Sequence, residues 1–231
     1  MAVLEFDKTG ERFYETGAKN AVLYPISDSG TYAIGVVWNG LTNVTHSPEG
    51  AEPNDLWADD MKYATIRSAE NFKCTIEAYQ YPTEFNQCNG VAAPINGMFI
   101  GQQTRKAFGL SYITQIGNDI SQSVGQKLHL LYGLTASPSE LAYQTINDSP
   151  DGVQMSWECT STPVNITGYA PTSEITLDSR DLKPEAWTAL ISKLHGNTEA
   201  ASLPLPDEIK QIITTASQSA QAKESSSPSN A

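Results

Sequence analysis

Alternation of apolar and polar residues at period two is the feature that most constrains this chain. Apolar side chains take every second position from Val153 to Cys159, and polar side chains fill the positions between them. Residues 72–79 alternate in the same way. Successive side chains of a strand point to opposite faces, so both segments predict β-strands with one buried face.

Five further segments, rich in β-branched and aromatic residues, also predict strands. They are residues 31–38, 62–67, 107–116, 127–134 and 174–178. Turn sequences separate them, among them Asn39-Gly40, Asn89-Gly90 and the Pro-Asp-Gly of 150–152. Many short strands with turns between them favour a mainly β fold, an antiparallel β-sandwich or barrel.

Two long connections interrupt this pattern. Residues 47–60 contain two prolines and several acidic side chains, and residues 81–104 are rich in Gly, Pro and Asn but also contain apolar side chains. Loops of this length in a compact domain are usually functional or ordered by a partner. We predict that the second loop contains a short helix or buries itself against a neighbour.

The periodicity becomes helical after Asp181. Residues 184–195 place four apolar side chains at helical spacing, with Asp181 as N-cap candidate and Gly196 just past the end. A second helix is expected at 207–223. These patterns divide the chain into a β-sandwich domain (1–181), a C-terminal helical extension (182–224) and a disordered tail (225–231).

The charge balance excludes several classes of protein. The net charge is −12 and the sequence pI about 4.6, whereas binding to phosphates requires clustered Lys and Arg. No segment has the features of a signal peptide or a membrane span, so we expect folding in a cytoplasm. Three cysteines without a CxxC pair predict buried thiols, and no metal site is expected.

No catalytic motif is present in the sequence, so we expect neither an enzyme nor a cofactor. Of the three histidines, His46 lies in a turn-rich stretch. His129 lies in an alternating strand, where it would face solvent or a lumen, and His195 ends a helix, where a positive charge suits the helix dipole.

One segment approaches an EF-hand calcium loop. Asn147, Ser149, Asp151, Gly152 and Glu158 have nearly the required spacing. The residues after Gly152 alternate as a strand, however, where an EF-hand needs a helix. A tight turn that leads into a strand is therefore the preferred interpretation, and ion binding is left open.

Several segments resemble the major tail tube proteins of long-tailed (siphophage-type) bacteriophages, especially phages of Gram-positive bacteria. The resemblance covers about residues 1 to 180. Its segments are FDKTGERFYETG at 6–17, LYP at 23–25, WNGLT at 38–42, SPEGAEP at 47–53, ADD at 58–60, TIEAY at 75–79 with Pro82, GQQTRK at 101–106, and NDSP at 147–150 followed by Trp157 and Glu158.

The resemblance implies a sandwich of two antiparallel sheets with a flanking helix and no catalytic residue. Six copies would form a ring, and stacked rings would form a tube that conducts genomic DNA without sequence-specific binding. Other implied partners are the tape measure protein and the distal tail and terminator proteins, and no membrane. The protein would be located in the virion, after assembly in the host cytoplasm.

Two sets of residues are candidates for these roles. The acidic loop is the expected contact between subunits, through Glu49, Glu52, Pro53, Asp55 and Trp57. The polar faces of the two alternating strands are candidates for the lumen, although an ordinary outer surface explains either set equally well. These residues are Lys73, Thr75, Glu77, Gln154, Ser156 and Glu158.

Two alternatives remain open from the sequence. One is a carbohydrate- or receptor-binding β-sandwich module of a phage tip or cell-surface protein, with Trp38, Trp57 and Tyr81 as the exposed aromatics of a groove. The other is a glycosidase that uses a pair of carboxylates, which the absence of a catalytic signature places last.

Overall fold

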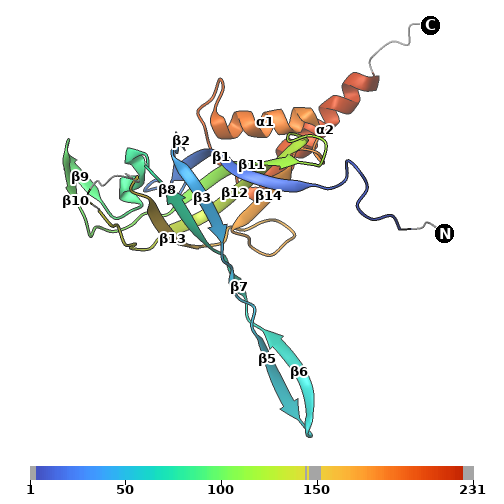
Figure 1. The fold of residues 1–231 in the computed structure, drawn as a ribbon, viewed down its shortest axis with the longest axis horizontal. Coiled ribbons are helices and arrows are strands. Elements are labelled where there is room, and N and C mark those ends of the chain that lie inside the picture. Colours follow the sequence, from blue (N-terminus) through green and yellow to red (C-terminus); the bar gives the residue numbers. More distant parts are fainter. Residues whose placement is uncertain (1–3, 144, 146–151, 226–231) are drawn as a thin grey trace.

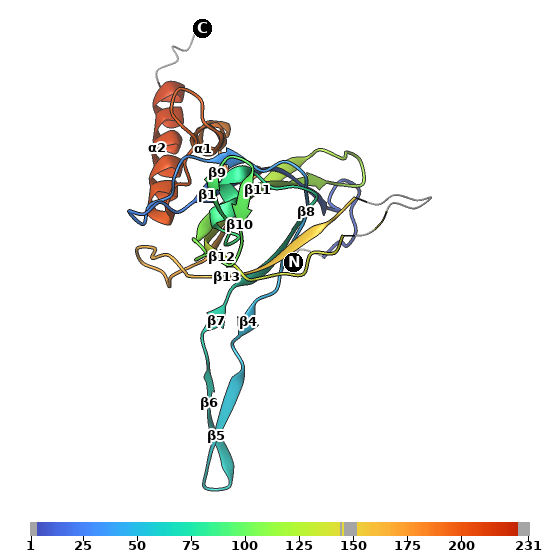
Figure 2. The same cartoon turned by 90° about the vertical axis from the view of Figure 1, so that its left-hand side faces the viewer.

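The computed structural model describes residues 4–143, 145 and 152–225. The chain forms a curved, mainly antiparallel β body with two helices against one side and a long two-stranded projection (Figures 1 and 2). No helix in the described part of the chain is long and apolar enough to cross a membrane.

Eight strands form the main sheet, in the order β2-β1-β11-β12-β13-β8-β3, with β14 also paired to β12. All pairings in it are antiparallel. Their bounds are β1 (Tyr14–Pro25), β2 (Val36–Val37), β3 (Leu41–His46), β8 (Lys73–Ala78), β11 (Phe108–Gly117), β12 (Gly125–Ala136), β13 (Met155–Ser161) and β14 (Glu174–Asp178).

Strand β12 makes this sheet fold over on itself. Residues 127–131 of β12 pair with β14, and residues 134–136 pair with β13. The strands β13, β8 and β3 therefore turn away from the first layer and face β1 and β11 across a shared core. The result is an open sandwich, not a closed barrel.

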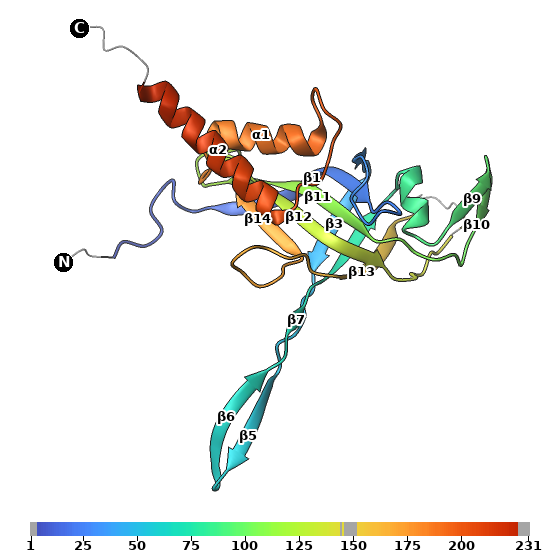
Figure 3. The same ribbon diagram turned by 180° about the vertical axis from the view of Figure 1, so that it is seen from behind.

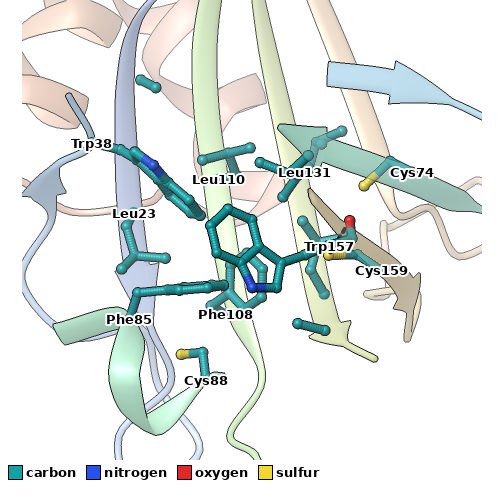
Figure 4. Close-up of a cluster of buried hydrophobic side chains, with 14 of the residues drawn as sticks. Leu23, Trp38, Cys74, Phe85, Cys88, Phe108, Leu110, Leu131, Trp157 and Cys159 are labelled. Carbon is teal, nitrogen blue, oxygen red and sulfur yellow. Dashed lines mark hydrogen bonds between the residues drawn. The ribbon is translucent and has the colours of Figure 1, made fainter. Parts of the chain in front are cut away.

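Aromatic side chains fill the core between the two layers (Figure 4). The ring of Phe85 lies 4.6 Å from that of Trp38, 5.2 Å from Trp157 and 5.3 Å from Phe108. Offset and edge-to-face pairs of this kind add to the free energy gained by burial. Cys74, Cys88 and Cys159 are buried free thiols, which confirms the sequence prediction.

A second core lies on the other face of β1, β11 and β12, beneath helices α1 (Pro184–His195) and α2 (Pro206–Ser225). Leu190 and Leu194 of α1 pack there against Leu128 and Leu130. The hydroxyl of Tyr24 donates a hydrogen bond to the Leu194 carbonyl at 2.8 Å. Residues 21–25 of β1 and most of β11 and β12 are consequently buried on both faces.

The structure confirms the two alternating strands, four of the five further strands and both helices. Residues 31–38 were wrongly predicted as one strand, because only Val36–Val37 forms a strand there and Tyr32 makes an isolated bridge to Ile26, while β1 and β3 were missed. The predicted N-cap is also wrong, since α1 begins after Lys183 and not after Asp181. Most of the calcium-like segment, including Asn147, lies outside the described residues.

The two long connections contain regular structure. Residues 81–104 hold the 3₁₀ helix η1 (Thr83–Gln87) and a hairpin of β9 (Ala92–Ile95) and β10 (Met98–Ile100). This confirms the short helix, and its Phe85 is fully buried. The acidic connection forms two paired segments, β4 (Glu49–Gly50) with β7 (Glu70–Asn71) and β5 (Pro53–Ala58) with β6 (Met61–Arg67).

Candidate assembly surfaces

A two-stranded arm, residues 49–71, projects away from the β body (Figures 1 and 3). All five predicted contact residues lie on it: Glu49, Glu52, Pro53, Asp55 and Trp57. The sequence had indicated a loop at 47–60, whereas the structure shows an antiparallel ribbon. The arm keeps these side chains well away from their own core.

Backbone geometry fixes both ends of the arm. At the tip, Asp59 and Asp60 have φ of 50° and 56°, the two positive φ values that a type I′ hairpin turn requires. At the base, Gly50 has φ of 93°, and a Cβ there would lie 2.5 Å from the carbonyl oxygen of Ala69. Glycine at position 50 therefore allows the two strands to approach where the arm leaves the body.

The arm exposes large apolar side chains. Trp57 is 68% exposed and Tyr63 is 76% exposed. Three more exposed apolar side chains accompany them: Leu56, Met61 and Ile66. Clusters of exposed apolar side chains are common at sites of protein–protein interaction.

Ion pairs hold the arm in shape without covering these apolar groups. The ammonium group of Lys62 lies 2.8 Å from the Asp55 carboxylate, which also accepts a hydrogen bond from Thr65 at 2.7 Å. At the base, Lys73 of β8 pairs with Glu49 at 2.6 Å. Such exposed pairs contribute little stability individually, so we assign them an orienting role.

The candidate lumen residues of the two alternating strands lie together on one face. In the register of β8 and β13, Ser156 stands opposite Glu77 and Glu158 opposite Thr75. Strand β3 extends the same face with Asn43 and Thr45. We call this surface the polar face; it comprises Asn43, Thr45, Lys73, Thr75, Glu77, Gln154, Ser156 and Glu158.

Hydrogen bonds and charge give the polar face a definite character. Asn43 and Gln154 both donate to the Glu77 carboxylate, at 3.2 Å and 3.4 Å. The single cation, Lys73, is paired with Glu49 of the arm. The remaining charges on this face are the carboxylates of Glu77 and Glu158, so its net character is acidic.

A polar cluster that the sequence did not indicate joins the two layers near the base of the arm. Its members come from five strands and are Glu15, His46, Tyr112, His129 and Glu174. His46 lies 3.2 Å from the Glu174 carboxylate and 2.8 Å from the Tyr112 hydroxyl. His129 lies 3.3 Å from Glu15, and its ring stacks on Tyr112.

Burial and hydrogen bonding determine the ionisation of this cluster. Burial opposes the ionisation of Glu15, but hydrogen bonds from Lys127 and Thr114 outweigh it and hold the pKa of Glu15 below its usual value. The hydrogen bond from His46 lowers the pKa of Glu174 in spite of partial burial. Burial lowers the pKa of His129, although Glu15 acts in the opposite direction.

The histidines therefore differ from what the sequence suggested. His129 faces this cluster between the layers and not open solvent, with its side chain 12% exposed. Burial lowers the pKa of His195, and among the described residues its Nε2 has no hydrogen-bond partner. A positive charge that complements the helix dipole is thus disfavoured at His195.

Within the described ranges, no group of three or more His, Cys, Asp or Glu side chains is placed to hold a metal ion.

The three aromatics proposed for a carbohydrate groove do not form one. Trp38 is 2% exposed and belongs to the core, and Tyr81 packs against Phe85 and Trp157. Trp57 lies far from both, on the arm. The binding-module alternative thereby loses the feature on which it depended.

Comparison with family models found no match, and comparison with curated proteins found none either. Among solved structures, one match is a chain of the six-fold symmetrised cryo-EM structure of the anti-feeding prophage (AFP) baseplate. It shares 8% sequence identity at a TM-score of 0.33 and covers 75% of this chain and 97% of that chain. At this TM-score the match carries no weight in the functional argument.

Proposed function

We propose that this chain is a structural subunit of a bacteriophage tail, whose hexameric rings stack into the tube that conducts genomic DNA into the host. The observation that carries the proposal is the arm, a projecting two-stranded ribbon with exposed apolar side chains. The sequence segments that resemble those of tail tube proteins, which span about residues 1 to 180, support it independently.

The arm suits contact between subunits for energetic reasons. Exposed aromatic and aliphatic side chains gain about 25 cal/mol for each Å² that is removed from water. The monomer leaves Trp57 and Tyr63 largely in solvent, so this free energy becomes available only when another chain covers the arm. In the proposed ring, the arm of one copy would contact the β body of the next copy, so the contact would join two unlike surfaces. Such heterologous contacts produce rings and filaments.

The polar face suits the inside of a tube. A ring of six copies with about four strands from each would form a barrel of ~24 strands, with a backbone diameter of roughly 45–50 Å at ~4.8 Å spacing and ~40° tilt. After side chains are added, a duplex ~20 Å wide can pass. An acidic wall repels phosphates, so DNA would slide without being bound.

This role requires neither catalysis nor a cofactor from the chain. Its partners would be further copies of itself, the tape measure protein inside the tube, the distal tail and terminator proteins at the tube ends, and the passing DNA. Its location would be the virion, after assembly in the cytoplasm of the host bacterium.

The test is removal of the arm. Residues 51–69 are deleted and Gly50 is joined to Glu70 by an Asn-Gly turn, which preserves the base pairing of β4 with β7. Wild-type protein should form rings or tubes in negative-stain micrographs, while the armless variant should sediment as a folded monomer. Near-UV circular dichroism of the buried tryptophans reports folding. Tubes from the armless variant, or a wild type that stays monomeric at all concentrations, would contradict the proposal.

A further inference from the structure

The hairpin of β9 and β10 is a second projecting element, separate from the arm. It stands at the end of the body opposite the N-terminal segment (Figures 1 and 3). Among the residues that the structure describes, its two strands pair only with each other, Met98 opposite Ile95 and Ile100 opposite Ala92. It joins the body through η1, which is anchored by the buried Phe85.

Every large side chain of this hairpin faces solvent. Ile95 is 68% exposed and Phe99 is 61% exposed, and Met98 and Ile100 are exposed as well. An isolated two-stranded hairpin is only marginally stable in water. An apolar hairpin held clear of its own core therefore gains stability when another surface covers it.

The hairpin also lacks the protection that the arm possesses. Residues 85–104 contain no charged side chain, although the whole chain carries a net charge of −12. Strands exposed at an edge are normally guarded by charges, as the arm is by Asp55, Lys62 and Arg67. An uncharged edge is consistent with a surface that is covered in the assembled protein.

The absence of charge also indicates which partner fits. Two acidic copies of one chain repel each other, and the repulsion is smallest where the contact surface is uncharged. A basic partner would instead favour the acidic surfaces of the molecule. We infer that the β9–β10 hairpin is a docking surface for a second copy of this chain, distinct from the arm. The inference rests on the self-assembly described under the proposed function.

The test introduces a charge where the hairpin would be buried. Phe99→Asp should raise the protein concentration needed for assembly by about tenfold or more, since docking would then remove a carboxylate at position 99 from water in place of an apolar ring. Tyr169→Asp is the matched control, because Tyr169 is an aromatic residue of similar exposure, 74%, in a different loop. Its assembly should stay near that of wild type. Equal assembly of Phe99→Asp and wild type would overturn the inference.

A photo-cross-linking amino acid at position 99 gives a second measurement that keeps an aromatic side chain. Under assembly conditions it should yield a covalent dimer of the chain on a denaturing gel, and the absence of a dimer would count against docking there. These measurements separate the failure of the proposed function from the failure of the hairpin as a docking surface. A wild type that never assembles defeats the proposed function, whereas a wild type that assembles without this cross-link defeats only the role of the hairpin.

Discussion

At Gly133, strand β12 changes partners from β14 to β13, and the backbone leaves the conformation of a regular strand. Gly133 has φ of 59°, and a Cβ at this position would overlap the carbonyl oxygen of Thr162. Glycine is therefore required both for its dihedral angle and for the close approach of a second chain segment. One residue thus permits the fold of the sheet that creates the sandwich.

Gly133→Ala should lower the free energy of unfolding by about 3 kcal/mol or more, because strain at positive φ adds to overlap in a packed region. Gly168→Ala is the control, since Gly168 has φ of 84° with open space around it. It should cost only about 1–2 kcal/mol. Urea denaturation of both variants measures the difference, and equal losses would show that the Thr162 contact is unimportant.

The histidine cluster makes a prediction about pH. Because burial lowers the pKa of His129, the folded state favours its neutral form, so its contribution to stability is present above the ordinary value of 6.5 and is lost as pH falls below it. The lowered pKa of Glu174 removes further stability below about 4.5. An NMR titration should give His129 a midpoint below 6.5, and a midpoint at or above that value would contradict this account.

His129→Gln should accordingly weaken the acid dependence of the unfolding free energy just below pH 6.5. Some dependence must remain, because burial also lowers the pKa of His195. The variant His195→Gln serves as the comparison. Of the three variants, the double variant should have the unfolding free energy that depends least on pH. Measurements at neutral pH show whether either change alters packing independently of protonation.

At the scale of elements, the sequence predicted those strands and helices that bury one face only, because their apolar residues recur at a regular spacing. Strands β8 and β13 each have one buried face, and α1 buries a single stripe, so their patterns were clear. Strand β1 was missed because residues 21–25 are buried between two cores and do not alternate. In the arm, β6 was predicted as a strand, but its partner β5 was taken as part of a loop, because all its residues are solvent-exposed and leave no apolar period.

Some of the candidate site residues could be predicted from local sequence, and others could not. The arm residues and the polar face followed from local sequence, and pairing of β8 with β13 then brought the two lumen sets together. The cluster of His46 with Glu174 did not follow, because it depends on how β3 meets β14 across the sandwich. Contacts between strands far apart in sequence carry no local signal.

The arm should be energetically separate from the folded body. Trp57→Ala should change the unfolding free energy of the monomer by no more than about 0.5 kcal/mol, since the side chain is mostly in solvent. It should nevertheless raise the concentration needed for assembly by about tenfold or more, as expected for an aromatic anchor. Leu190→Ala, in the core beneath α1, should show the reverse and cost about 2–5 kcal/mol of stability. Calorimetry and sedimentation together test this, and a Trp57→Ala variant that destabilises the monomer would contradict it.

At the scale of the whole molecule, the distribution of charge matters more than its sum. The net charge of −12 counts every charged side chain of the chain, but only carboxylates that line a channel can act on DNA passing through it. Screening limits such effects to about 8–10 Å at physiological ionic strength. Charges on the helix layer would therefore have little influence on DNA within a tube.

Reversing charge on the polar face tests whether that face lines the tube. Assembled tubes of the double variant Glu77→Lys, Glu158→Lys should retain short duplex DNA that wild-type tubes release. The retention should weaken steeply with salt, because each phosphate contact releases condensed counterions. The matched control reverses two exposed acidic residues of the helical region, Glu185→Lys and Glu199→Lys, which changes the net charge equally. If the control tubes retain as much DNA as the polar-face variant, total charge explains the result and the polar face lies outside the channel.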